Sequence, residues 1–434
     1  MADDDTRELH RGVGLTGVVM FGAGTAIGVS IFSVLQPAAE IAGAGLLLAI
    51  AVSAVPMMLF AIAYAWLASV APTSGASYEW PRRFLGPFTG FAIAWLRIIS
   101  NVGAIVILVR VLANYVGMIA PIPELPMIVA VVTLIFALNY IGVTATTRVQ
   151  IVLMLVLIGI LALFVATGLP YVSSARIGSL TAGGTASVLA AVPLLISLFL
   201  GIESAVEIGD EVKAPHRTIP LGIAMAIAMT AIVYCAVAAT ALGLIGPVAL
   251  AASKAPLLDA ARVPLGALAV PIIVGAAVVS TIKAMNAAAL VFSRSIFAMA
   301  RKGALPATLV AVHPRFGTPH HAVIACYIAA LCGLFLPPSL IFLLLAVNIP
   351  TMLKYIACSL CAAKASGQSD LAETSRLRLS PRLVQTVGYM AAVAGVVIIA
   401  AGFETDWRPY ALVVGWFAVG LVVYVVYSRH HARG

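Results

Sequence analysis

The sequence predicts an all-α integral membrane protein with about twelve transmembrane helices. Of its 434 residues, 62% are hydrophobic and only 9% are charged, and the mean hydropathy is +1.11. Soluble domains are about 45–50% apolar and about 25% charged, so this composition excludes a soluble fold. A helix needs about 20 apolar residues to cross a bilayer. At that length the chain divides into roughly twelve apolar runs, near residues 15–37, 46–70, 88–119, 125–143, 149–170, 187–208, 218–246, 268–298, 319–337, 339–363, 384–403 and 409–427.

These runs leave little sequence for loops, so we expect one polytopic domain without a separate catalytic module. The opening MADDDTRELHRGVG is acidic and lacks the cationic start of a signal peptide, which predicts that the first run remains as a spanning helix. The expected organisation is a cytoplasmic tail, a ten-helix transport core, a cytoplasmic loop, two additional helices and a second tail, at residues 1–14, 15–363, 364–383, 384–427 and 428–434.

Lysine and arginine residues gather on one side of the expected membrane. With the N-terminus in the cytoplasm, the loops on the opposite side hold only Arg176, Lys254, Arg262 and Arg408. The loops on the cytoplasmic side hold Arg7, Arg11, Arg82, Arg83, Arg148, Lys213, Arg217, Arg294, Arg301, Lys302, Arg315, Lys364, Arg376, Arg378, Arg382, Arg429 and Arg433. This asymmetry follows the positive-inside rule and predicts a multi-pass protein of the plasma or inner membrane with both termini cytoplasmic. The basic charge therefore indicates topology, and nucleic acid is not an expected partner.

The first apolar run is interrupted by small residues. The stretch GAGTAIGVSIF places Gly22, Gly24 and Gly28, with Thr25 and Ser30, in the middle of the span. Interrupted helices expose backbone amides and carbonyls to a polar solute inside the membrane, which is typical of transporters. The same glycines would also allow close helix packing, and spacing alone leaves both interpretations open.

The sixth run carries a similar signature in LFLGIESAVEIGDE, where Gly201 stands beside Glu203. A carboxylate at this depth is costly unless paired, so we expect Glu203 to hold unwound backbone or to carry a proton. Glu207 lies four residues further along and shares a face with Glu203 if this stretch is helical. The first five runs and the next five would then each open with a broken helix. The core is therefore expected to be two inverted repeats of five helices.

Five stretches extend this pattern along most of the chain: GTAIGVSIF, PTSGASYEWPRRFLGP, LNYIGV, GIESAVEIGDEVKAPHRTIP and MNAAALVFSRSIFAMARKGALP. They resemble, in the same order, the glycine-rich stretch of helix 1, the SGGxY and LGP stretch after helix 2, the end of helix 4, the helix 6 stretch and the end of helix 8 in the amino acid-polyamine-organocation (APC) superfamily. The resemblance implies two five-helix inverted repeats plus two extra helices, with a solute bound between the unwound parts of helices 1 and 6.

The resemblance also implies the substrate-binding residues. Backbone amides near Gly28, Val29 and Ser30 would hold a carboxylate at the positive end of a half-helix. The other implied residues receive the amine through carbonyls or face the pocket; they are Gly22, Ala23, Thr25, Ser197, Leu198, Phe199, Gly201 and Ile202. The family's small GSG at the first break is Gly28-Val29-Ser30 in this chain.

Many proton-coupled members of that superfamily carry a lysine in helix 5, and here Leu157 or Ile158 takes its place. The stretch STIKAMNAAAL instead puts Lys283 halfway along the eighth run. We hypothesise that Lys283 tethers the broken helix 1 or titrates as protons move, because buried lysines shift their pKa readily. A purely structural ion pair is the alternative.

The other charges within the runs, Glu40, Arg97, Arg110 and Lys354, are expected to form structural pairs near helix ends. Counted with Lys283 and the two acids of the sixth run, cations slightly outnumber anions. A positive pocket disfavours arginine and polyamines and suits a neutral or anionic amino acid.

The predicted function is therefore a secondary active transporter of amino acids or related small amines, working by alternating access as a proton-coupled symporter. The alternatives are an amino acid or polyamine exchanger, and a non-transporting membrane sensor or partner-binding protein of the same fold. The sequence holds no nucleophile and base pair, metal cluster or phosphate loop, so we expect no enzyme, no cofactor and no metal site. The expected partners are the solute, protons and membrane lipid.

Overall fold

The computed structural model describes residues 13–431 except 29, 74, 118, 142–143, 182, 203–205, 207–211, 338, 369, 372–374, 376, 378 and 404–405. Over these ranges the protein is all-helical, and its one β-bridge, between Val13 and Val212, belongs to no sheet. Ten helical stretches of the described chain are long and apolar enough to cross a membrane. Two shorter apolar helices cover Gly184–Leu198 and His320–Gly333.

The first half of the chain opens with a helix in two parts, α1 (Leu15–Ala26) and α2 (Ser30–Ala42). It continues with η1 (Gly43–Gly45), α3 (Leu46–Val70), α4 (Ala76–Phe84), α5 (Pro87–Gly117), α6 (Glu124–Ile141), α7 (Thr144–Gly168), η2 (Leu169–Tyr171) and α8 (Ser174–Ile177). The apolar runs predicted the long helices. None of these runs covers α4, which begins directly after Gly75, a residue in the left-handed conformation.

The second half again opens with an interrupted segment, α9 (Gly184–Leu195) followed by η3 (Ile196–Leu198). It continues with α11 (Pro215–Ala252), α12 (Pro256–Leu265), η5 (Gly266–Leu268), α13 (Ala269–Arg301), η6 (Ala307–Val310), α14 (His320–Gly333), α15 (Leu340–Ala365), α17 (Pro381–Phe403) and α18 (Arg408–His431). Within α11, Gly246 has φ 78° and introduces a kink, with Pro247 next to it.

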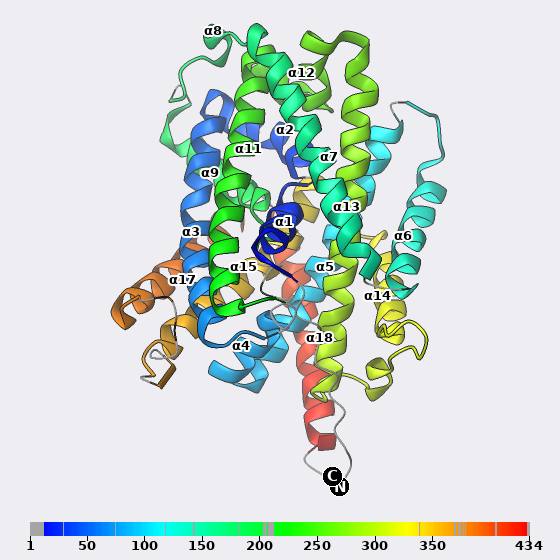
Figure 1. Ribbon diagram of the computed structural model, residues 1–434, viewed down its shortest axis with the longest axis vertical. Coiled ribbons are helices and arrows are strands. Elements are labelled where there is room, and N and C mark those ends of the chain that lie inside the picture. The colour runs from blue at the N-terminus through cyan, green and yellow to red at the C-terminus, as the bar shows by residue number, and fades with distance from the viewer. Residues whose placement is uncertain are drawn as a thin grey trace.

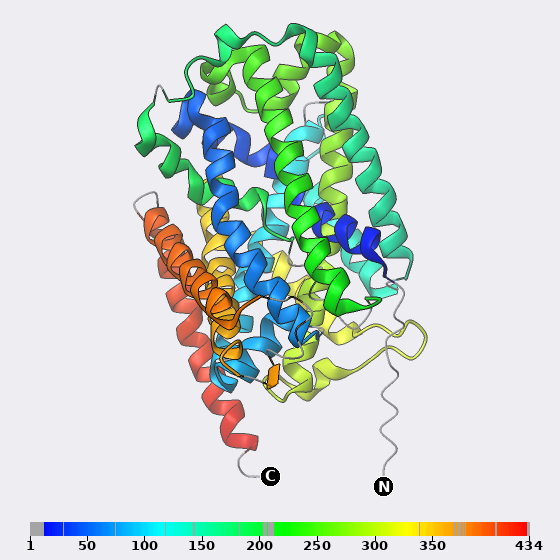
Figure 2. The same cartoon turned by 60° about the vertical axis from the view of Figure 1, so that its left-hand side comes forward.

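The helices form one elongated bundle with α1 at its centre (Figures 1 and 2). Helices α8 and α12 lie at one end, which we name the α8 end; α4 and the last turns of α18 lie at the other, which we name the α4 end. Central placement of α1 follows from its composition, since Val18 and Ala23 are fully buried and the helix carries no charged residue.

The last two helices lie on one outer flank of the bundle (Figure 2). Helix α17 packs on α15 and α3, and α18 packs on α5 and α15. Trp95 of α5 and Trp416 of α18 stack with ring centroids 4.8 Å apart. Each indole N–H donates to the other residue's carbonyl oxygen, at 2.9 and 3.0 Å. The reciprocal pair attaches α18 to the bundle. It also provides hydrogen-bond acceptors for the two indole N–H groups, which lipid chains cannot do.

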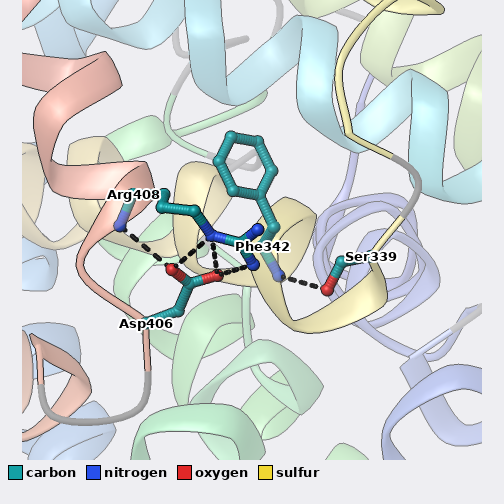
Figure 3. A network of polar contacts seen from close by, with 4 residues as sticks. All are labelled: Ser339, Phe342, Asp406 and Arg408. Atoms are coloured by element: carbon teal, nitrogen blue, oxygen red, sulfur yellow. Dashed lines mark hydrogen bonds and ion pairs between the residues drawn. The ribbon is translucent and has the colours of Figure 1, made fainter.

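The start of α18 is also fixed to the start of α15 (Figure 3). The Arg408 guanidinium donates to both carboxylate oxygens of Asp406 and stacks over the Phe342 ring at 5.8 Å. Ser339 caps α15 by accepting a hydrogen bond from the Phe342 amide at 3.3 Å. The hydrogen bonds from Arg408 lower the pKa of the Asp406 carboxyl.

Candidate functional site

The first helix breaks in the middle of the bundle, between Ala26 and Ser30. Ile27 leaves the helical region with ψ 86°. The freed backbone is bound by Tyr234 of α11, whose hydroxyl donates to the Ala26 carbonyl at 2.5 Å and accepts from the Gly28 amide at 3.3 Å. Tyr234 is fully buried. Its hydroxyl gives hydrogen-bond partners to two backbone groups that would be costly to leave unpaired inside a membrane.

Lys283 of α13 binds the same break from the other side. Its ammonium donates to the carbonyls of Gly24 and Ile27, the second at 2.8 Å, and contacts the Met154 sulfur of α7 at 3.2 Å. The side chain is fully buried. An ammonium has three N–H groups, and these three neighbours provide an acceptor for each. A cation thus joins the broken α1 to α13 and α7.

The second break follows α9, where a 3-10 turn and then Gly201, with φ 102°, replace the helix. Pro193 lies inside α9, and its carbonyl accepts a hydrogen bond from the side-chain amide (Nδ2) of Asn348 of α15 at 3.1 Å. The Ser197 hydroxyl turns back onto the Leu194 carbonyl at 2.5 Å. The expected coupling residues Glu203 and Glu207, like Val29, lie outside the described residues.

The two breaks touch each other. The Ser30 hydroxyl, at the first residue of α2, donates to the Ser197 carbonyl at 3.0 Å. Gly201 packs on Thr25 so closely that a Cβ atom there would lie 2.5 Å from the Thr25 Cγ2 atom. Side chains and backbone of both interrupted helices therefore meet at one place.

A cavity of about 970 Å³, counting its open mouth, lies beside this contact. It is lined by residues of α1, α2, α5, the α9 break, α13 and α15, namely Thr25, Ser30, Arg97, Ser100, Asn101, Ala104, Ile107, Leu108, Ser197, Leu200, Gly201, Ala284, Ala287, Ala288, Val291, Leu344, Val347, Asn348, Thr351 and Lys354.

Four residues of the expected substrate site line this cavity: Thr25, Ser30, Ser197 and Gly201. The other described ones, Gly22, Ala23, Gly28, Leu198, Phe199 and Ile202, are buried near it and are not among its lining residues. Ile202 instead lines a smaller pocket next to Phe60 and Tyr355. The backbone of the breaks is thus brought together, while Ile202 points to a different part of the core.

The cavity is polar at one end and apolar at the other. The Ser100 hydroxyl of α5 contacts the Val347 carbonyl and the Thr351 hydroxyl of α15. Further along α5, Gly103 approaches Leu343, which lies earlier in α15, so the two helices run antiparallel across the cavity. Arg97 and Lys354 therefore lie at the same end. Ile107, Leu108 and Leu344 lie at the opposite end, and these three are apolar.

Two expectations about the charges need correction. Arg97 and Lys354 were expected near helix ends, but Arg97 lies well inside α5 and Lys354 lies near the middle of α15. Both are buried and line the cavity. The positions of both residues within the apolar runs 88–119 and 339–363 already indicate that they lie inside the membrane. Glu40 does lie near the end of α2, where it accepts from Gln36 at 3.2 Å.

Sequence reasoning also missed Tyr234 and Met154, which contact the first break. Nothing in the apolar runs around them predicts that role, although a buried tyrosine needs a partner for its hydroxyl. Within the described part of the chain, no group of three or more His, Cys, Asp or Glu side chains lies close enough to bind a metal ion.

Comparison with known proteins identifies the family of this chain. The family model described as amino acid permease matches residues 13–428. An uncharacterised transporter of Mycobacterium tuberculosis (strain H37Rv) is 36% identical over 75% of this chain and 74% of its own length. The branched-chain amino acid permease BcaP of Bacillus subtilis is 26% identical, covering 100% of this chain and 96% of the relative. The methylthioribose transporter of the same organism is 27% identical, covering 99% and 96%.

The family match spans nearly the whole chain and includes both helix breaks and the cavity between them. Members of this family are membrane transporters and not enzymes, in agreement with the motifs and with the ten long apolar helices. The chain is therefore a multi-pass membrane protein that belongs to the amino acid permease family of the APC superfamily.

Proposed function

We propose that this protein is a secondary active transporter that moves a neutral or anionic amino acid across the cell membrane by alternating access, coupled to protons. The observation that carries the proposal is the meeting of the two helix breaks, through Ser30 and Ser197, at the wall of the central cavity. Backbone that is not used by a helix can bind a polar solute there.

The proposed architecture is a core of two inverted five-helix repeats, at residues 15–363, with two additional helices at 384–427. The ten long apolar helices and the two shorter ones, Gly184–Leu198 and His320–Gly333, together supply the twelve spans that this arrangement needs. The α4 end, which carries Arg82, Arg83 and Arg301, faces the cytoplasm in this proposal, as the positive-inside rule predicts. Both termini are then cytoplasmic.

The proposed solute binds with its carboxylate at the start of α2, near Gly28, Val29 and Ser30, where the helix dipole favours negative charge. Its amine faces carbonyls of the two breaks, including those near Leu198 and Phe199. Arg97 and Lys354 line one end of the cavity, which disfavours a cationic solute. The apolar end suits a branched or thioether group, and relatives are named for branched-chain amino acids and methylthioribose.

Lys283 is the proposed coupling residue. A charged ammonium can serve all three of its neighbours, whereas a neutral amine has one N–H fewer and must give up a contact. Loss of the proton therefore weakens the attachment of α1 to α13. Movement of α1 would then follow the protonation state, and Glu203 and Glu207 remain predicted participants in the same coupling.

Uptake by purified protein in proteoliposomes tests this proposal. The panel contains labelled leucine, valine, alanine, glutamate, arginine, putrescine and methylthioribose, each with and without an inward proton gradient. We expect gradient-stimulated uptake of a neutral or anionic amino acid and none of arginine or putrescine. Uptake that requires internal solute indicates an exchanger instead, and the absence of uptake under every condition favours a non-transporting sensor of the same fold.

A further inference from the structure

A second hollow lies next to the central cavity, towards the α4 end. It measures about 540 Å³, counting its open side, and is lined by residues of α1, α4, α5 and α13. The small residues Gly75, Ala94 and Ala298 leave the space open. Its polar lining residues are Ser77, Tyr78, Arg97, Arg294 and Ser295. We name it the α4 hollow.

The α4 hollow and the central cavity share two lining residues, Arg97 of α5 and Val291 of α13. Arg97 is only 9% exposed, although it borders both spaces. Its side chain and that of Val291 therefore lie at the boundary between the two spaces. A solute that travels directly from the central cavity into the α4 hollow passes this pair.

The two helices present polar groups on both sides of the separation. On α5, Ser100 and Asn101 line the central cavity one turn from Arg97, about 5 Å along the helix axis. On α13, Arg294 lies three residues beyond Val291 and lines the α4 hollow. A carboxylate would thus meet neutral polar groups first, then one guanidinium, and then a second.

The lining residues described for the two spaces include the guanidinium groups of Arg97 and Arg294. Tyr78 adds no negative charge near neutral pH, because burial raises its pKa to about 12. A guanidinium matches a carboxylate with two parallel hydrogen bonds, which an ammonium or a neutral side chain does not. The chemistry along this route therefore favours a solute that carries a carboxylate.

We propose that Arg97, with Val291 opposite, is the gate between the central cavity and the α4 hollow, and that it admits solute to the α4 end by binding its carboxylate. This inference rests on the proposed transport function and adds a specificity-determining residue to it. Arg97 opens the route when it turns from the central cavity to the α4 hollow, and Arg294 receives the carboxylate next.

Thiol labelling tests the gate without any solute. In a background whose native cysteines are replaced by alanine, Ala287→Cys places a thiol in the central cavity and Ser295→Cys places one in the α4 hollow. A charged methanethiosulfonate reagent is added to inside-out vesicles, which expose the α4 end. We expect Arg97→Ala to raise the labelling rate of Ala287→Cys by about tenfold and to leave Ser295→Cys unchanged. The matched control, Arg110→Ala, changes an arginine on the same helix that is not among the cavity's lining residues and leaves both rates unchanged.

An unchanged Ala287→Cys rate in folded Arg97→Ala protein overturns the gate. If Arg97→Ala does not fold, Val291→Trp tests the same separation in the opposite direction, because a larger side chain should lower the Ala287→Cys rate; an unchanged rate again overturns the gate. Carboxylate recognition is measured by competition between an amino acid and its carboxamide, whose affinity ratio should fall towards one in Arg97→Ala. An increased labelling rate without uptake of any amino acid overturns the transport function and leaves the gate standing.

Discussion

The Lys283 ammonium donates a hydrogen bond to the Ile27 carbonyl at 2.8 Å, across the gap between α1 and α2. This contact connects a charge on α13 to the residue at which the first helix stops, and Met154 of α7 is in contact with the same nitrogen. The broken helix is thus bound at its end by a group whose hydrogen-bonding capacity depends on one proton.

Lys283→Met should abolish transport and leave the protein folded. Methionine fills a similar volume but donates no hydrogen bond, so the carbonyls of Gly24 and Ile27 lose their cation. Uptake should fall by at least about tenfold, and size-exclusion profiles should stay those of the wild type. Lys254→Met, at an exposed position, is the matched control and should transport normally. Normal uptake by Lys283→Met would rule out the coupling role.

Tyr234→Phe should destabilise the first break. The change removes one hydroxyl and leaves the Ala26 carbonyl and the Gly28 amide without that partner, at a cost of about 1–3 kcal/mol. The unfolding temperature in detergent should fall, and solute affinity should fall with it. Tyr389→Phe, at an exposed position of α17, is the control and should change neither. An unaltered unfolding temperature in Tyr234→Phe would mean that the hydroxyl does not support the break.

Gly201→Ala should separate the two breaks and lower solute affinity. A Cβ atom at Gly201 would come within 2.5 Å of Thr25, and φ 102° is unfavourable for alanine. Gly86→Ala is a control for strain alone, since Gly86 has φ 115° and open space around its Cβ position. We expect isothermal titration to show weaker binding for Gly201→Ala and unchanged binding for Gly86→Ala. Equal affinities in the two variants would contradict a functional contact with Thr25.

Trp416→Phe should loosen α18 without stopping transport. Phenylalanine keeps the stacking on Trp95 but loses one of the two indole hydrogen bonds, worth about 0.5–1.5 kcal/mol. Hydrogen exchange in α18 should become faster while uptake stays within twofold, or about 0.4 kcal/mol. Trp407→Phe, which changes an exposed indole, is the control. A large loss of uptake in Trp416→Phe would show that the outer helices take part in transport.

The Asp406 and Arg408 pair should make stability depend on pH only in acid. Since the folded state lowers the Asp406 pKa, its contribution is fully present above the ordinary aspartate value of about 3.9 and is lost as pH falls through the lowered value. The difference in unfolding temperature between the wild type and Asp406→Asn should therefore be constant from about pH 5 to 8 and shrink below about pH 4. A difference that changes between pH 6 and 8 would point to another group.

The sequence alone predicted the long helices well. The run 46–70 coincides with α3, and 384–403 and 409–427 lie inside α17 and α18. Length and hydropathy suffice for this because a bilayer imposes the same apolar length on every helix that crosses it. The sequence did not predict α4 or α12, whose ends depend on Gly75 and on a proline-flanked turn. Such short helices depend on local capping and packing more than on hydropathy.

The sequence by itself determined that this is a helical membrane protein, because mean hydropathy is a property of the chain, and its glycines made Gly22–Ser30 and the stretch around Gly201 candidate interruptions. Only the tertiary structure decided which groups bind those interruptions. Lys283 and Tyr234 lie far from the first break in sequence, and only the packing of α13 and α11 brings them to it. The same holds for Arg97 and Lys354. Their charges can be read from the sequence, but the antiparallel contact of α5 and α15 places both residues at the same end of the cavity.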